Sequence, residues 1–478
     1  MHGEHRFSLF LALAGIFVTV ALSCWSIPLL DEHAGTYFSV FLILTVGCLI
    51  IAVRSLAEAE TLRPGHRRGM ISLLGMIVFG LGFLGFAAAH FFWPSASGTD
   101  SPSAIARLTE LGWTVKPAPD GIQFGLTDRA LPPMQRSAAY FGQLSNPFAL
   151  QLQRVTELEG LHFLAGVSAC KRIEINAGEF SDISELRGFD HLDSLVISQL
   201  PLNGAGTVDA SPLASLTNLT NLNLNSTRVR DVEFVASLAH LRTLNIGQTL
   251  VGDISPLAGL PSLETLDIRG SRVVALQPLS KDRSLRELSI GGLQVPGLIS
   301  LVSLENLKKL TIIIEQQSGF DLTPVGKLAN LESLMIWLPM GVALDVAPLR
   351  SLVKLRSLQL SGASFFRPPT EIANVGAIAG LTELTTLTLG SLQLTDIAFV
   401  AKLTKLEEVN IDEMPISSID SLRNLRSLKK VSLSSTRVTD ISPLLDLPAL
   451  TDLTVRRTPA RSDVLSELAR RGVRVTSY

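Results

Sequence analysis

Residues 219 to 241 read LTNLNLNSTRVRDVEFVASLAHL, and the spacing of the leucines in this stretch decides the fold. Leu219, Leu222 and Leu224 form the pattern L-x-x-L-x-L, which begins again 22 residues later at Leu241. Alternate side chains of a strand share a face, so Leu222 and Leu224 lie on one side of a short strand. One such strand cannot bury its apolar side alone, and the stretch therefore predicts stacking against further copies of itself.

The pattern recurs along most of the chain. Of the twelve intervals between its thirteen copies, eight are 22 residues long, and the others are 27, 24, 24 and 29. The copies begin at Cys170, Leu192, Leu219, Leu241, Leu263, Leu285, Leu307, Leu331, Leu355, Leu384, Leu406, Leu428 and Leu450. Strands stacked ~4.8 Å apart would form a sheet of roughly 60 Å along its arc. The sequence thus predicts an α/β repeat fold, a solenoid with a curved parallel sheet and turns or short helices on its convex side.

A polar second half completes each copy. An Asp three residues before Pro, as in Asp253-Ile-Ser-Pro256, suits the capped start of a turn or short helix. We interpret these carboxylates as turn caps and not as a calcium site, because calcium loops gather several carboxylates within one short loop. The recurring residues are Asp182, Asp231, Asp253, Asp396 and Asp440.

The copy that begins at Leu219 resembles the internalin-type class of bacterial leucine-rich repeat proteins, and the resemblance covers residues 148–478. It implies a curved solenoid that binds proteins through its concave sheet. Two features depart from that class. Internalins are secreted or attached to the cell wall, whereas this chain begins with apolar segments, and we see no sorting motif after the repeats.

Both ends of the solenoid are expected to carry caps, because terminal repeats must shield the core. We expect an N-terminal cap over residues 104–147, which opens with a helix that ends at Gly112, then the solenoid over 148–457 and a C-terminal cap over 458–478. Cys170 occupies an inward leucine position and is predicted to be a core residue.

Three apolar segments precede the repeats, at residues 7–30, 37–53 and 70–93, and none contains Asp, Glu, Lys or Arg. The first and third exceed the ~20 residues that a helix needs to span a bilayer, and the middle one is at the short limit of roughly 17. We therefore predict three transmembrane helices, followed by a linker over residues 94–103.

Charge in the loops sets the expected orientation. The second loop carries Arg54, Arg63, Arg67 and Arg68, whereas the first has neither Lys nor Arg. The positive-inside rule then places the N-terminus in the cytoplasm and the repeats outside the cytoplasmic membrane, in the periplasm or at the cell exterior.

Small residues in the third apolar segment leave a second function open. Gly85 and Ala89 are spaced as in close helix pairs, although glycine is also common in membrane helices. If they form a seam between copies, the chain is a homo-oligomeric envelope scaffold or spacer.

Composition and motifs argue against nucleic-acid binding, catalysis and metal binding. The net charge is −2, from 41 Lys and Arg against 43 Asp and Glu, and provides no electrostatic footprint for nucleic acid. No catalytic or metal-binding motif occurs. We therefore predict a protein that is not an enzyme and uses no metal and no cofactor.

Function is then expected on the outward positions of the concave sheet, most of which are small or polar. Ile313, Met335 and Trp337 form an exception, and Lys309 and Arg356 lie nearby in the repeat pattern. An exposed Trp beside cations is typical of a protein-binding hot spot. Alternatively, the insertion in the longest repeat, with Phe-Phe-Arg-Pro-Pro at residues 365–369, covers Trp337 as a satellite core.

Overall fold

The computed structural model describes residues 102–477, except 119–120, 128–130, 201–206, 293–294, 316–319, 340 and 363–369. They belong to one compact unit, Gly98–Tyr478. The described part of the chain contains no helix that is both long and apolar enough to cross a bilayer. The expected membrane helices, with Gly85 and Ala89, lie outside the described residues.

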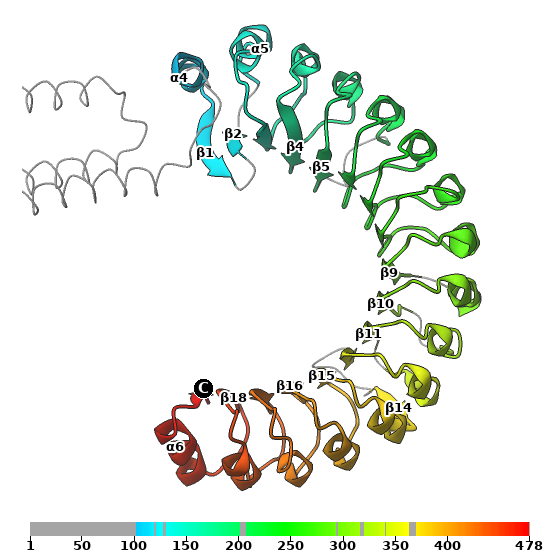
Figure 1. Cartoon of the computed structure of the whole chain (residues 1–478), viewed down its shortest axis with the longest axis vertical. Coiled ribbons are helices and arrows are strands. Elements are labelled where there is room, and N and C mark those ends of the chain that lie inside the picture. Colours follow the sequence, from blue (N-terminus) through cyan, green and yellow to red (C-terminus); the bar gives the residue numbers. More distant parts are fainter. Residues whose placement is uncertain are drawn as a thin grey trace, which may run out of the picture. The chain divides into compact units, whose positions relative to one another are not determined.

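The described residues form one sheet of 17 strands on the concave side of the repeat unit (Figure 1). Neighbours from β2 onward are parallel, and β1 pairs antiparallel with β2 at one edge. The strands are β1 (Thr114–Ala118), β2 (Gly121–Thr127), β3 (Phe148–Gln153), β4 (Cys170–Asn176), β5 (Ser194–Ser198), β6 (Asn221–Asn223), β7 (Thr243–Asn245), β8 (Thr265–Asp267), β9 (Glu287–Gly291), β10 (Lys309–Ile313), β11 (Ser333–Leu338), β13 (Ser357–Gly362), β15 (Thr386–Gly390), β16 (Glu408–Asn410), β17 (Lys430–Ser432), β18 (Asp452–Thr454) and β19 (Arg474–Thr476).

Short 3₁₀ helices line the convex side, one after each large-sheet strand from β3 to β17 (Figure 1). Those of the described residues are η2 (Leu161–Leu164), η3 (Ser184–Leu186), η4 (Ser211–Ser215), η5 (Glu233–Ser237), η6 (Ser255–Leu257), η7 (Gln277–Lys281), η8 (Val295–Ser303), η9 (Val325–Lys327), η10 (Ala347–Ser351), η11 (Val375–Gly380), η12 (Ala398–Lys402), η13 (Asp420–Leu422) and η14 (Ser442–Asp446). The predicted solenoid, with a parallel sheet and short helices on its convex side, is confirmed.

The core is a ladder of leucines in register. Leu222, Leu244, Leu266 and Leu288 are direct partners on the successive strands β6 to β9, and each is 1 % exposed or less. Cys170 begins β4 and is buried in the same core, as predicted.

The turn after most of the strands in the regular repeats uses the left-handed backbone region. Ser226, Gln248 and Ser435 have φ between +52° and +57°, and Gly270, at the same position of its repeat, has φ +65°. A hydroxyl next to the turn stabilises it: Thr249 donates from its Oγ1 to the carbonyl oxygen of Ile246 at 2.7 Å.

The recurring aspartates cap the 3₁₀ helices. The Oδ1 atom of Asp253 accepts a hydrogen bond from the backbone N–H of Ser255 at 2.8 Å and another from the Ser255 hydroxyl at 2.6 Å. The hydroxyl bond first, and then the backbone bond, lowers the pKa of the Asp253 carboxyl. Asp182, Asp396 and Asp440 accept the equivalent backbone bond, whereas Asp231 accepts none in the described structure. No group of three or more His, Cys, Asp or Glu in the described residues could hold a metal ion.

Helices cover both ends of the core. The N-terminal cap holds α4 (Pro102–Glu110) and α5 (Met134–Phe141), and the C-terminal end holds α6 (Ser462–Arg470). Trp113 packs edge-on against Phe141, and its indole N–H donates to the hydroxyl of Ser137 at 3.1 Å. Helix α4 begins at Pro102, inside the expected linker, and the sequence reasoning did not predict α5.

Candidate functional site

The three apolar residues singled out in the sequence lie together on the concave face. Ile313 of β10 is the direct partner of Trp337 of β11, and Met335 precedes Trp337 by two residues on the same side of that strand. Trp337 is 45 % exposed, and Ile313 and Met335 are partly exposed. We call these three residues the apolar patch. The residues of the expected cover, 365–369, lie outside the described part of the chain.

Longer strands build the patch. Strands β6 to β8 have three residues, whereas β10 has five and β11 has six. The extra residues belong to the runs Thr-Ile-Ile and Met-Ile-Trp-Leu, which are rich in the β-branched and aromatic side chains that strands favour. This extension adds the pair Ile313 and Trp337 to the sheet.

A second small sheet adjoins these long repeats in the chain. It consists of β12 (Ala343–Asp345) and β14 (Glu371–Ala373), which pair in parallel. Both strands follow the concave strands β11 and β13 in sequence, so the extra residues of the 24- and 29-residue repeats are partly used for this pairing. The sequence reasoning did not predict this sheet.

The cations near the patch differ in their partners. Lys309 begins β10, and its Nζ atom lies 3.4 Å from Glu287 Oε2 on β9. Lys308 forms an ion pair with Glu332, with 2.8 Å between Nζ and Oε1. Arg356, which precedes β13, is exposed and forms no ion pair with any described residue. Of the two predicted site cations, Lys309 is therefore neutralised within the sheet, and Arg356 keeps its charge available.

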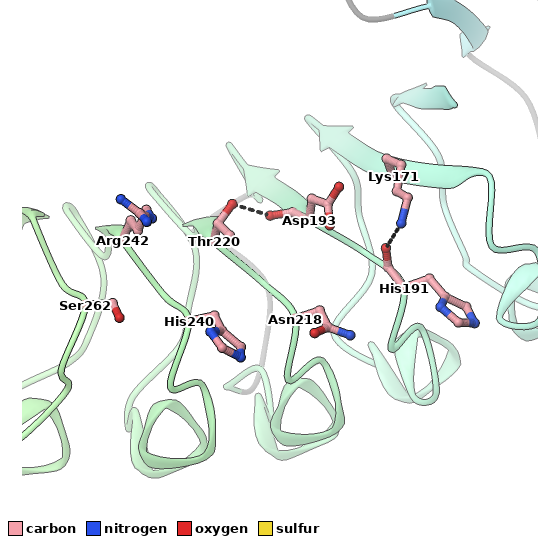
Figure 2. Close-up of a pocket in the computed structure, with 8 residues that line it drawn as sticks. All are labelled: Lys171, His191, Asp193, Asn218, Thr220, His240, Arg242 and Ser262. Carbon is pink, nitrogen blue, oxygen red and sulfur yellow. Dashed lines mark hydrogen bonds between the residues drawn. The ribbon is translucent and has the colours of Figure 1, made fainter. Parts of the chain in front are cut away.

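A separate polar hollow of about 450 Å³ lies on the side of the solenoid, beside the starts of strands β4 to β8 (Figure 2). Figure 2 shows Asn218 between His191 and His240 along the repeats. The two long cationic side chains that line the hollow are engaged: Lys171 Nζ donates to the carbonyl oxygen of His191 at 3.1 Å, and Arg242 donates to Glu264 at 2.8 Å. We assign this hollow no ligand. The sequence reasoning missed it, although its residues occupy the positions directly before and after the first leucine of each repeat.

The buried thiol offers no reactive site. Burial raises the pKa of Cys170 to about 12, so the thiolate that reacts with electrophiles and metals is scarce near neutral pH. This thiol has a packing role.

Comparison with known structures agrees with this geometry. An internalin from Listeria monocytogenes is similar to the chain at 26 % identity, with a TM-score of 0.52, over 66 % of this chain and 88 % of the internalin. The fold is that of a leucine-rich repeat protein. A leucine-rich repeat protein from Leptospira interrogans has a TM-score of 0.56 at 16 % identity, over 74 % of this chain and 89 % of its own. No protein-family model matches the chain, and no curated protein matches it in sequence.

Proposed function

We propose that this leucine-rich repeat protein binds a protein partner through its concave face, with the apolar patch at the centre of the interface. The observation that carries the proposal is the exposure of Trp337, which is 45 % accessible although it lies in the middle of a sheet. Its neighbour Ile313 is partly exposed, so the two form a continuous apolar surface and not isolated residues.

The energetics of recognition support this reading. Exposed apolar groups that adjoin one another mark interaction sites, whereas single exposed apolar residues are ordinary. Binding energy concentrates in a few residues, among which Trp is enriched. The surrounding positions, such as Gln359 and Thr388, are polar and uncharged, and such residues can form the rim that excludes water from a central aromatic contact.

We further propose that the repeats are anchored to the cytoplasmic membrane by the three apolar segments and face away from the cytoplasm. The length of these segments and the arginines of the second loop support this orientation. A reporter enzyme that is active only outside the cytoplasm, fused after residue 477, should be active, and a cytoplasmic reporter at the same position should be silent. The reverse pattern would contradict the orientation.

Photo-crosslinking tests the binding function directly. A benzoylphenylalanine placed at position 337 in the full chain, in living cells, should give a discrete adduct with one protein. Thr454 lies on the concave face of β18, four strands from β13, and provides the control position. Equal adduct patterns from both positions, or no adduct from position 337, would contradict the proposal.

A further inference from the structure

On one side of Trp337, the next residues in the concave row have small side chains or none. Trp337 pairs with Ser361 of β13, and Ser361 pairs with Gly390 of β15. Among the described residues, a Cβ atom placed at Gly390 would meet only the Ser361 Oγ atom, at 4.0 Å. Ser361 itself is buried, and its Oγ atom accepts a hydrogen bond from the Gln359 side chain at 3.3 Å, whereas Gly390 is partly exposed. Within two strands the row therefore passes from an exposed indole, over a buried serine, to backbone without a side chain. We call this place, formed by Ser361 and Gly390 beside Trp337, the Gly390 step.

Arg356 lies at the start of the strand that carries Ser361. Both nearby carboxylates already have lysine partners: Lys308 bonds Glu332 at 2.8 Å, and Lys405 bonds Glu383 at 2.6 Å. The bond from Lys308 lowers the pKa of Glu332 most, and the charge of Arg356 contributes less. For Glu383, the bond from Lys405 lowers the pKa most, and the charge of Arg356 again contributes less. The Arg356 guanidinium is thus an exposed cation whose neighbouring acids are neutralised by others.

We infer that the partner presents an extended acidic segment, which places a flat aromatic side chain on the Gly390 step against Trp337 and a carboxylate on Arg356. The inference rests on the proposed function and specifies its chemistry. Aromatic rings pack favourably against an indole, and a guanidinium takes a carboxylate through two parallel hydrogen bonds. A bare backbone floor admits a ring that a side chain at position 390 would exclude.

Geometry sets the spacing of the two groups. Arg356 directly precedes β13 and lies five residues before Ser361, which corresponds to about 16 Å at ~3.3 Å per extended residue. An extended partner segment that runs along β13 covers the same length with about five residues. The acid and the aromatic residue of the partner should therefore be separated by four to six positions.

A phage-displayed library of random 15-residue peptides, panned on the full chain in detergent micelles, tests the inference. Enriched peptides should carry Asp or Glu four to six positions from Trp, Phe or Tyr. One enriched peptide, made synthetically and labelled, then serves as the probe for Kd measurements by fluorescence anisotropy.

Three variants separate the contacts. Gly390→Leu should weaken peptide binding at least tenfold, because its side chain fills the step, and the fold should persist because a Cβ at this position meets no described atom closer than 4.0 Å. Arg356→Gln should weaken it by a similar factor, and Arg356→Lys by less, since charge remains without the bidentate geometry. Thr454→Leu, the matched concave control, should leave the Kd unchanged. Matching circular dichroism spectra and Tm values show that each variant is folded.

Exchanging the charges of Arg356 and of the peptide's acidic residue provides the decisive experiment. Arg356→Glu should lose the peptide, and a peptide with Lys in place of its acid should restore binding to that variant. Peptides that depend on Trp337 but carry no acid, or that ignore Arg356→Gln, overturn the inference and leave the proposed function standing. Peptides that bind Trp337→Ala as well as the parent chain, or no enrichment at all, overturn both.

Discussion

Ile313 lies directly opposite Trp337 on neighbouring parallel strands, and both side chains are accessible on the concave face. On its other side Ile313 lies over Gly291, where a Cβ atom would come within 3.2 Å of the Ile313 Cβ. Beyond Trp337 the same row continues with Ser361 and then Gly390. The apolar patch is therefore bounded on both sides by small, buried residues, so its three side chains stand above the positions beside them.

Binding and stability should separate on β11. Trp337→Ala should abolish binding of the protein that is crosslinked at position 337. It should change the free energy of unfolding by less than about 1 kcal/mol, because the indole is half exposed. Leu334→Ala, on the buried face of the same strand, should cost about 2–5 kcal/mol. Urea denaturation of both variants checks the contrast. A loss of several kcal/mol in Trp337→Ala would show that the indole is a core group.

The N-terminal cap should depend on one buried hydrogen bond. Trp113→Phe keeps most of the ring but removes the donor to Ser137, whose hydroxyl is fully buried. The unpaired hydroxyl should lower the free energy of unfolding by about 1–3 kcal/mol. The variant Ser137→Ala, which removes the acceptor, should combine with Trp113→Phe at less than the sum of the two single costs. Additive costs would contradict this coupling.

Glycine at the repeat turn should matter only where the backbone is left-handed. Gly270→Ala places a Cβ at φ +65° and within 3.3 Å of the Gln248 side chain, so it should destabilise the protein by about 1–2 kcal/mol. Gly390→Ala, in an ordinary strand conformation with open space, should be neutral or slightly stabilising. Thermal unfolding of the two variants measures the difference, and equal Tm values would contradict it.

The aspartate caps predict a loss of stability in acid. Hydrogen bonds from Ser255 lower the pKa of Asp253 below its ordinary value of 3.8, and Asp440 is shifted in the same direction by Ser442. A carboxyl group with a depressed folded pKa stabilises the fold fully above its unfolded pKa, and this contribution disappears as the pH falls through the folded pKa. Asp253→Asn should therefore be less stable than the parent at pH 6, with the gap closing below about pH 4. A gap that does not depend on pH would refute the role of the charge.

The buried thiol provides a probe of autonomous folding. A fragment of residues 98–478 contains Cys170 as its single cysteine and corresponds to the compact unit with both caps. We expect this fragment to unfold cooperatively, and its thiol to react with a disulfide reagent only when urea unfolds it. Rapid labelling in native buffer would show that the fragment does not form the closed core.

The repeat core could be read from the sequence because one leucine pattern determines burial and register together. Leu222 and Leu244 are 22 residues apart, and they are direct partners in the sheet. The pairing of Lys309 with Glu287 follows from the same interval, although the sequence reasoning did not use it. Regular spacing transfers from one repeat to the next, so a single period positions most concave side chains.

Features of the irregular repeats could not be derived in this way. Strands β12 and β14 pair across repeats of unequal length, where the period gives no register. Helix α5 belongs to the cap, whose contacts are aromatic and not repetitive: Phe141 packs against Phe124 and Phe148. The space that the described residues leave at Gly390 depends on which side chains reach over it, and the repeat period does not determine that.

Oxidative footprinting of the complex tests the central claim most directly. Met335 and Trp337 are accessible on the concave face, whereas Trp113 is buried in the cap and acts as an internal reference. When the protein captured by crosslinking at position 337 is added, oxidation of Met335 and Trp337 by hydroxyl radicals should fall several-fold and oxidation of Trp113 should stay constant. Unchanged oxidation of Met335 and Trp337 at saturating partner would contradict a binding site at the apolar patch.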